Sequence, residues 1–313
     1  MKNEPSALIK AVVLGHAVAD ALGVPVEFCD REALDASPVT DMVGFGTYPF
    51  PAGCWSDDTS MSLAALDSLA LGRVDLGDIM EKFGAWYYKD AYTPTGELFD
   101  VGNTCSFAIE NYFEGHLAPT ECGLSGDRSN GNGSLMRIHP FVLYAFAKEL
   151  SLNEKIALIH KASALTHAHE TSLLGCGIYA FILSALLKTP DKGAVSQALS
   201  AAKAYYADKK DLSAYSRLFE ADFSKTDRAS IKSGGYVVDT LEAAVYCLLN
   251  TNSYRDCVLA AVNLGDDTDT VAAVAGGLAG ALYGLASIPK EWLATLKRAD
   301  YIEALCEKAL AAW

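Results

Sequence analysis

Two short segments of the sequence combine adjacent carboxylates with hydroxyl side chains. The first reads Trp55-Ser56-Asp57-Asp58-Thr59-Ser60, and the second reads Gly265-Asp266-Asp267-Thr268-Asp269-Thr270. Each precedes an alanine-rich stretch with helical spacing, and its polar residues are types that favour a helix N-cap and first turn. A cap uses one side-chain oxygen, with at most a second acid three residues later, so adjacent carboxylates exceed what capping requires. Alone, each segment fits either a cap or a functional site.

The pair of segments is more informative than either one. If the two helix starts converge, four or five carboxylates share a small volume, and their mutual repulsion raises their pKa values unless a cation neutralises them. Two hard divalent ions, Mg²⁺ or Mn²⁺, suit such a group because they take carboxylate and hydroxyl oxygens and tolerate bound water. We therefore expect a metal site rather than a pair of caps.

Two other classes of helical, metal-dependent enzyme fit the motifs less well. Isoprenoid synthases, which process diphosphates with Mg²⁺, use an Asp-Asp-x-x-Asp motif, whereas Asp57-Asp58-Thr59-Ser60-Met61 lacks the last acid. Phosphohydrolases of the HD class need a histidine followed directly by aspartate, and the histidine-rich stretch here is Thr166-His167-Ala168-His169-Glu170. A magnesium-dependent diphosphate-processing enzyme stays as the weaker alternative.

The elements that must position these residues are predicted to be helices. Apolar residues recur at helical spacing along most of the chain, and period-two alternation bounded by turns is hard to find. We expect an all-α protein, with residues 1–313 forming a single compact, orthogonal multi-helix domain. The expected helices cover about Ser6–Leu22, Thr59–Leu71, Leu76–Lys89, Thr104–Glu114, Ser134–Glu149, Leu152–Leu165, His169–Leu187, Asp191–Ala207, Leu212–Asp222, Tyr236–Leu249, Tyr254–Val262, Thr268–Leu285 and Lys290–Ala311.

Two long irregular stretches separate the expected helices. Val39–Trp55 and Ala118–Gly133 are rich in glycine and contain proline, and each leads to a polar motif that opens an expected helix. Loops of this length are uncommon in compact helical proteins and often line binding sites. We expect both loops near the functional site.

Composition narrows the partners and the compartment. The sequence is 51% hydrophobic and 20% charged, which is typical of a chain with a large core, and its net charge of -14 disfavours binding to nucleic acid or anionic membranes. Its 8 cysteines are scattered without a Cys-x-x-Cys pair, and residues 1–10 lack the basic and apolar regions of a signal peptide. We expect a cytoplasmic, monomeric protein.

Two uncharged segments could be mistaken for membrane spans. Val271–Ile288 contains a Gly-x-x-x-Gly series at Gly276, Gly280 and Gly284, and Thr171–Leu187 is also free of charge. Acidic residues abut the first segment and no basic cluster flanks it, so we expect core helices whose small residues let neighbouring helices approach closely.

Five blocks in order resemble the ADP-ribosylglycohydrolase family, which includes the glycohydrolase that removes ADP-ribose from an arginine of dinitrogenase reductase. The blocks are Gly15–Phe28, Ser56–Met61, Gly131–Arg137, Thr166-His167 and Asn263–Gly284. The resemblance implies an all-α fold with a binuclear Mg²⁺ or Mn²⁺ centre. The implied metal ligands are Ser56, Asp57, Asp58, Asp267, Asp269 and Thr270.

The resemblance also implies roles outside the two acidic segments. Glu27 matches the family's mobile acidic residue, and Asp100 and Asn103 fall where arginine-directed members contact their substrate. Asn132, Gly133, Ser134 and Met136 match the loop that contacts the nucleotide, where backbone N–H groups at a helix N-terminus suit a pyrophosphate. His167 matches a ribose or phosphate contact, although an isolated histidine between helices is equally compatible with a structural role. Asp100 and Asn103 could also be a turn and a cap.

The implied reaction is hydrolysis of the glycosidic bond of an ADP-ribosyl group. The metals hold the distal ribose and a water of lowered pKa, Glu27 or Asp58 positions or deprotonates that water, and Asp100 pairs with a guanidinium leaving group. Because some relatives have lost the chemistry, a non-catalytic ADP-ribose-binding protein stays as the alternative. Two residues depart from the family pattern: Ala19 and Asp266 each stand where the family has glycine. Because Asp266 adds a carboxylate next to Asp267, the preference for one metal over another stays open.

Overall fold

The fold is described from a computed structural model that covers residues 5–313. Its α-helices are α1 (Pro5–Gly23), α2 (Arg31–Ala36), α3 (Asp57–Leu69), α4 (Leu76–Lys89), α5 (Asn103–Phe113), α6 (His139–Ala147), α7 (Leu152–Ala164), α8 (Glu170–Lys188), α9 (Lys192–Tyr205), α10 (Val237–Asn250), α11 (Tyr254–Val262), α12 (Thr268–Tyr283), α13 (Lys290–Thr295) and α14 (Ala299–Ala312). Short 3₁₀ segments and two isolated bridges, Leu124 to His167 and Gly131 to Tyr236, complete the described chain. The all-α prediction is confirmed.

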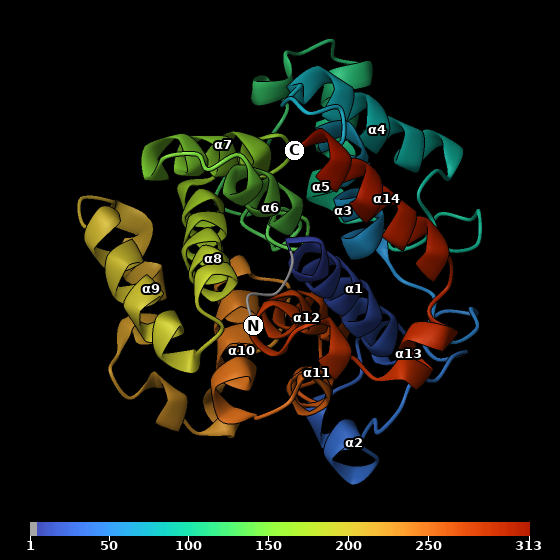
Figure 1. Cartoon of the computed structure of the whole chain (residues 1–313), viewed down its shortest axis with the longest axis vertical. Helices are drawn as coiled ribbons and strands as arrows, with labels where there is room; N and C mark the ends of the chain where they lie inside the picture. Colours follow the sequence, from blue (N-terminus) through green and yellow to red (C-terminus); the bar gives the residue numbers. More distant parts are fainter. Residues whose placement is uncertain (1–4) are drawn as a thin grey trace.

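Helices α1 and α12 lie side by side at the centre, and the other helices pack around them (Figure 1). Their contact is close because it is made of small residues. A Cβ added to Gly276 would lie 2.4 Å from the Gly15 carbonyl oxygen, and one added to Gly280 would lie 2.0 Å from the Ala11 carbonyl oxygen. The predicted role of the Gly-x-x-x-Gly series as a helix-packing surface is therefore confirmed for Gly276 and Gly280, and Gly284 ends α12 with φ 81°.

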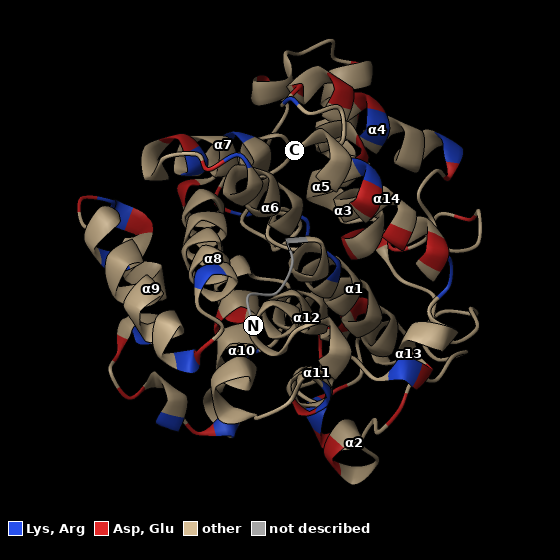
Figure 2. Ribbon diagram, in the orientation of Figure 1, with Lys and Arg blue, Asp and Glu red and all other residues tan. Residues whose placement is uncertain are grey.

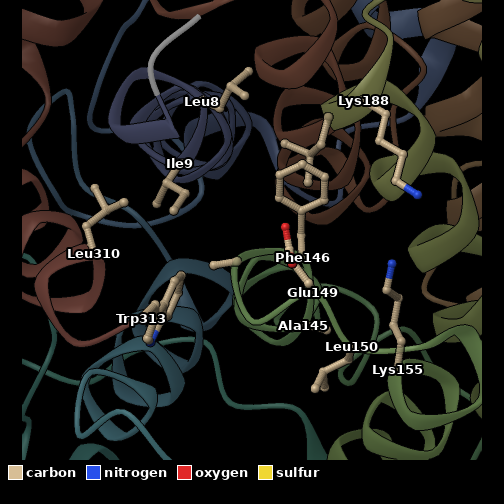
Figure 3. A pocket seen from close by; sticks show the side chains of 12 residues that line it. Leu8, Ile9, Ala145, Phe146, Glu149, Leu150, Lys155, Lys188, Leu310 and Trp313 are labelled. Carbon is tan, nitrogen blue, oxygen red and sulfur yellow. The ribbon is translucent and has the colours of Figure 1, made fainter.

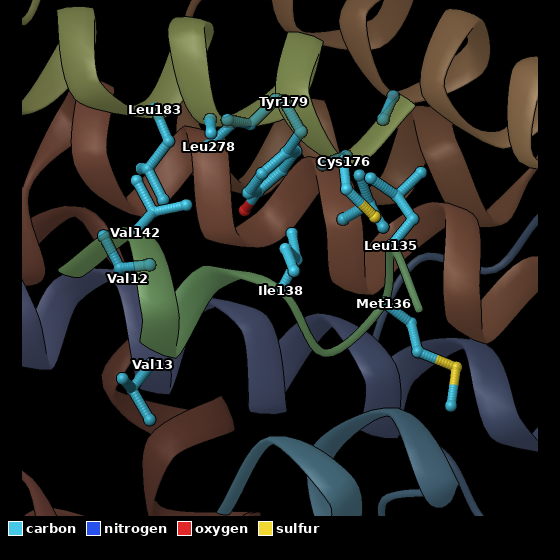
Figure 4. Close-up of a cluster of buried hydrophobic side chains, with 14 of the residues drawn as sticks. Val12, Val13, Leu135, Met136, Ile138, Val142, Cys176, Tyr179, Leu183 and Leu278 are labelled. Carbon is cyan, nitrogen blue, oxygen red and sulfur yellow. The ribbon is translucent and has the colours of Figure 1, made fainter. Parts of the chain in front are cut away.

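The core extends through every long helix of the described chain, from Ile9 of α1 to Ala309 of α14. Figure 4 shows one part of it, where α1, α8 and α12 meet the turn before α6. Leu135 lies beside Cys176 of α8, whereas Met136 points to the other side of the turn. Two consecutive side chains therefore point to different places: Leu135 packs in the core, and Met136 lines the hollow of the candidate site.

Two described helices are long and apolar enough to cross a bilayer by length and composition, Ser6–Val26 and Glu170–Lys188. Most of each is buried inside the fold. Glu170–Lys188 contains the expected core segment Thr171–Leu187, whereas Ser6–Val26 was not among the segments expected to resemble a span. Figure 2 shows both acidic and basic residues along α4 and α14 rather than one sign gathered on a helix.

Three predicted helices differ in the structure. Residues 134–138 form a turn, and α6 begins only at His139, where Pro140 fits the first helical turn because its missing N–H needs no partner there. Residues 210–219 form 3₁₀ segments instead of an α-helix.

The predicted helix Lys290–Ala311 is interrupted between α13 and α14. Lys297 donates its backbone N–H to the Gly53 carbonyl (2.9 Å), and Arg298 adopts φ 48°. The chain bends there to pack against the Val39–Trp55 loop. Helix α2 was not predicted.

Candidate metal and substrate site

The first acidic segment opens α3, and it does act as a cap. Ser56 is the N-cap residue, and its Oγ accepts a hydrogen bond from the Asp58 backbone N–H (3.4 Å). The Asp57 and Asp58 carboxylates take no part in capping this helix. Asp58 accepts a hydrogen bond at Oδ2 from the Thr270 hydroxyl (3.1 Å). The Ser56 hydroxyl has one proton to share between Asp58 Oδ2 (3.1 Å) and Asp20 Oδ1 (3.0 Å).

The bond from Thr270 to Asp58 joins the two acidic segments, which lie 212 residues apart in sequence. Thr270 and Asp269 are in the first turn of α12, and Asp267 is its N-cap residue without a side-chain capping bond. The predicted convergence of the two helix starts is thus present in the structure. Its cause is the α1–α12 contact, since a Cβ on Gly23 at the end of α1 would lie 2.3 Å from the Asp269 Cα.

Two further carboxylates join the cluster from loops. Glu27, Asp100 and Asp269 each place one carboxylate oxygen within 4.8 Å of the others. Glu27 follows α1 and is 5% exposed, while Asp100 lies before α5 with φ 51°. We call Asp57, Asp58, Asp267, Asp269, Glu27 and Asp100 the acidic side of the site.

The acidic side holds more negative charge than the surrounding protein balances. Burial, followed by repulsion from neighbouring carboxylates, raises the pKa values of Asp57, Asp58 and Asp269 well above the usual range. Burial and then the Asp100 charge raise the pKa of Glu27 to about 9, and burial raises that of Asp100 to about 6.

Several oxygens on the acidic side have no hydrogen-bond partner within residues 5–313. They are Glu27 Oε2, Asp58 Oδ1, Asp267 Oδ1 and Asp269 Oδ2. The ion pairs of the described chain involve none of these carboxylates. Buried, unpaired carboxylate oxygens that face one another are a suitable ligand set for hard divalent cations.

Asp20 is a functional candidate that the sequence reasoning did not assign. It is fully buried in α1 and accepts hydrogen bonds from the backbone N–H and the hydroxyl of both Ser56 (2.9 and 3.0 Å) and Thr59 (3.0 and 2.6 Å). These bonds fix the start of α3 against α1. The sequence offered two signals, an acid in a mostly apolar helix and its place in the first block of the family resemblance.

Asp266, the acid that replaces a family glycine, lies outside the cluster. Its side chain is exposed and its φ is 60°, a conformation that favours glycine. Its backbone forms reciprocal hydrogen bonds with the loop after Glu27, from Phe28 N–H (2.7 Å) and to the Cys29 carbonyl (2.8 Å). The residue therefore ties the Glu27 loop to α12 through its main chain.

A hollow of about 380 Å³ opens beside the acidic side. Ten of the predicted site residues line it, namely Glu27, Asp57, Asp100, Asn103, Asn132, Gly133, Met136, His167, Asp267 and Thr270. The other predicted ligands, Ser56, Asp58 and Asp269, are buried directly behind this surface. Ser134 is also fully buried, with its hydroxyl bonded to that of Ser163 (2.8 Å), so its side chain faces the core.

The lining of the hollow also includes hydrogen-bond donors. We call Asn103, Arg128, Gly131, Gly133 and His167 the donor side of the site. Arg128 is exposed and was not singled out from the sequence, although its loop was. The helix N-terminus on the donor side belongs to α5, which begins at Asn103, and not to a helix at Ser134 as predicted.

Asn132 connects the two sides. Its Nδ2 donates to Asp267 Oδ2 (2.9 Å) and to the Thr240 hydroxyl (3.0 Å), while its backbone N–H donates to the Gly235 carbonyl (3.0 Å). It thus orients an acidic-side carboxylate from the loop that also contains Gly131 and Gly133. A contact to substrate stays a prediction for this residue.

A larger hollow, of about 670 Å³, lies apart from these residues (Figure 3). Its lining is mainly apolar and includes Leu8, Phe146, Leu310 and Trp313, with Lys155 and Lys188 at one side. It contains none of the predicted site residues. Size alone does not identify a catalytic pocket, and the smaller hollow has the concentrated, unpaired polar groups that chemistry requires.

Comparison with known proteins agrees with the chemistry of the smaller hollow. The whole chain, residues 1–313, matches the family model described as ADP-ribosylglycohydrolase. An ADP-ribosylarginine hydrolase, Tri1, of Serratia proteamaculans is 36% identical over 96% of this chain and 78% of its own. An ADP-ribosyl-[dinitrogen reductase] glycohydrolase of Rhodospirillum rubrum is 33% identical, over 90% and 88% of the two chains. A solved structure titled ADP-ribosylglycohydrolase-related protein complex superposes with a TM-score of 0.83 at 30% identity and covers 99% of both chains.

Proposed function

This chain belongs to the ADP-ribosylglycohydrolase family, and we propose that it hydrolyses the N-glycosidic bond between ADP-ribose and an arginine side chain. It is an ADP-ribosylglycohydrolase enzyme. The observation that carries the proposal for arginine is the Asp100 carboxylate, which lines the hollow beside Glu27. A planar guanidinium is the cation best matched to carboxylate oxygens.

We propose that the acidic side binds two Mg²⁺ or Mn²⁺ ions. The unpaired oxygens of Asp58, Asp267 and Asp269 support this, because buried carboxylates in such proximity need a cation to stay ionised together. Ser56, Asp57 and Thr270 complete the proposed ligand set. When bound, such ions lower the pKa of a coordinated water and fix hydroxyl groups of the distal ribose.

The protein groups divide the remaining tasks. Departure of arginine builds positive charge on the ribose ring, and the ionised carboxylates of the acidic side stabilise that charge. Asp100 holds the guanidinium of the leaving group. Glu27 Oε2, which is buried and unpaired, accepts the proton of the attacking water. Asp58 Oδ1 is the other candidate for this proton, since it is equally unpaired.

The donor side is proposed to bind the diphosphate and nucleoside. Arg128 supplies a positive charge at the mouth, and the start of α5 presents backbone N–H groups toward the hollow. The glycines at 131 and 133 allow a ligand to approach the main chain closely. This wall leaves the acidic side free for the reacting ribose.

The decisive experiment is product analysis by mass spectrometry with an ADP-ribosyl-arginine peptide. We expect release of free ADP-ribose and unmodified arginine with Mg²⁺ or Mn²⁺, and loss of release in EDTA. Parallel serine-linked and O-acetyl substrates test the choice of leaving group. Binding of ADP-ribose without product from any substrate would reject the hydrolase mechanism and support the non-catalytic alternative.

A further inference from the structure

Arg137 is a buried guanidinium without a carboxylate partner in the described chain. It is fully buried in the turn before α6, and the ion pairs of residues 5–313 do not include it. Its Nη2 donates to the Ala162 carbonyl (3.2 Å) and to Thr166 Oγ1 (2.7 Å), and the Phe83 ring lies 4.7 Å from its Cζ. A buried charge is costly, so a specific arrangement around it invites a functional explanation.

The bond to Thr166 determines where the threonine proton points. A guanidinium has only donors, so Thr166 Oγ1 must accept from Arg137. The other partner within hydrogen-bond distance is His167 Nδ1 (2.8 Å). The Cys105 thiol is also near Thr166, but sulfur is a weak acceptor. The buried hydroxyl has one proton to place, and Nδ1 is a stronger acceptor than the Cys105 sulfur, which favours donation to an unprotonated Nδ1.

The consequence appears at the opposite nitrogen of the ring. A neutral histidine that accepts at Nδ1 carries its proton on Nε2. This edge faces the hollow, because a Cβ on Gly133 would lie 3.3 Å from Nε2 and one on Gly131 would lie 3.8 Å from it. Burial, and then the Arg137 charge, hold the pKa of His167 at about 3, so the ring stays neutral near pH 7.

We propose that Arg137 and Thr166 are positioning residues that lock His167 in the Nε2–H tautomer, so that it donates a hydrogen bond to a diphosphate oxygen of the substrate. The ligand part of this inference rests on the proposed function. Arg137 itself does not touch the substrate. It acts through Thr166, and its positive charge lies behind the wall that receives the phosphates.

The tautomer is measurable without substrate or turnover. Imidazole ¹⁵N–¹H correlation spectra of the full chain, recorded near pH 7 with Mg²⁺, distinguish a protonated from an unprotonated ring nitrogen. The signals of His167 are assigned by their loss in His167→Gln. We expect an unprotonated Nδ1 and a protonated Nε2 in the wild type. A protonated Nδ1 would overturn the proposal.

Variants of Thr166 then test whether its hydroxyl links Arg137 to His167, a connection that we call the relay. Thr166→Val removes the hydroxyl with little change in shape, and we expect a mixed or reversed tautomer and a loss in ADP affinity of about tenfold or more by calorimetry. Thr166→Ser keeps the hydroxyl and should restore both properties. Thr171→Val, which removes another buried threonine hydroxyl bonded to Asp211, is the matched control and should change neither. Unchanged tautomer and affinity in Thr166→Val would contradict the relay.

A second pair of variants, both at His167, tests which ring nitrogen donates to the ligand. The glutamine side chain in His167→Gln can present its amide N–H near the place of Nε2, whereas His167→Asn places an amide near Nδ1. We expect the glutamine variant to retain more ADP affinity than the asparagine variant, and the reverse order would argue against donation from Nε2. If the wild type binds no ADP at all, the proposed function fails, while the spectra still decide the tautomer.

Discussion

Buried charges in two regions of the molecule differ: the carboxylates around the hollow have no ion-pair partner in the described chain, whereas the carboxylate of Glu242 has one. Glu242, which is 3% exposed, forms an ion pair with Arg217. The carboxylates of the acidic side lack such a partner, and so does Arg137 behind the donor side. In this comparison the ion pair neutralises Glu242, while the carboxylates around the hollow stay unpaired, as expected where we propose that cations bind.

The largest expected effect separates turnover from affinity. Asp57→Asn should lower turnover of ADP-ribosyl-arginine by about 10³-fold or more, because one carboxylate of the acidic side then loses its charge. ADP, which lacks the distal ribose, should bind with nearly unchanged affinity. Release assays and calorimetry measure the two quantities. Normal turnover, or an equal loss in ADP binding, would show that the two sides do not have separate roles.

The next effect concerns stability and has opposite signs on the two sides. Arg137→Ala should lower the free energy of unfolding by about 3 kcal/mol, because it removes two hydrogen bonds and leaves a cavity beside Phe83. Asp57→Asn should leave the metal-free protein as stable as the wild type or more so, since it relieves repulsion. Urea unfolding in EDTA compares them. A destabilised Asp57→Asn variant would contradict this contrast.

The third effect is a pH dependence that arises from the acidic side. In the unfolded chain these carboxyls titrate near pH 4, whereas in the folded chain the pKa of Glu27 is about 9 and that of Asp100 about 6. Between about pH 4 and each folded-state pKa, the folded chain therefore binds more protons than the unfolded chain. The contribution of each group to stability is lost as the pH rises through this range.

Divalent cations should reverse that loss. Thermal scans in EDTA are expected to give a lower Tm near pH 8 than near pH 5, and saturating Mn²⁺ should raise Tm by roughly 5 °C near pH 8 but little near pH 5. Asp57→Asn should show a shallower pH dependence. An equal effect of Mn²⁺ at both pH values would place cation binding away from these carboxylates.

The smallest effect concerns Asp266. Because it is exposed with φ 60°, Asp266→Gly should stabilise the protein by about 0.5 kcal/mol. The affinity for Mn²⁺ should stay the same, since the side chain lies outside the cluster. Calorimetric titration checks this. A change of tenfold or more in Mn²⁺ affinity would make Asp266 part of the acidic side after all.

Local sequence patterns predicted the helices well where an apolar face alone determines the element. They failed where a distant segment intervenes. The break between α13 and α14 depends on a hydrogen bond from Lys297 to Gly53, and the late start of α6 follows a turn whose loop is bonded to Gly235. The 3₁₀ segments around Tyr215 and Leu218 bury residues at spacings that also fit an α-helix, so periodicity did not distinguish them.

The candidate site shows the same division. The two acidic segments were recognisable because their residues are adjacent in sequence, and the resemblance supplied the loop with Asn132 and Gly133. The resemblance supplied Glu27, Asp100 and His167 individually, but the approach of Glu27 and Asp100 to Asp269 depends on loop conformations with positive φ at Phe28 and Asp100. Asp20 and Arg137 lie within blocks of the resemblance, but their partners Thr59 and Thr166 are brought to them by the fold, so the blocks alone did not reveal their roles.

The glycine contact between α1 and α12 has a consequence for how the enzyme can change over evolutionary time. Where a Cβ on Gly23 would collide with the Asp269 backbone, the spacing between the two helices is set by main-chain atoms, which have no alternative rotamers. Mutations in the outer core can be absorbed by side-chain repacking without changing the distance between the carboxylates. A single methyl group added at this crossing cannot be absorbed in this way, because it would meet main-chain atoms of Asp269. Substitutions elsewhere in the core mainly change stability, whereas these few glycines keep the spacing between the carboxylates constant.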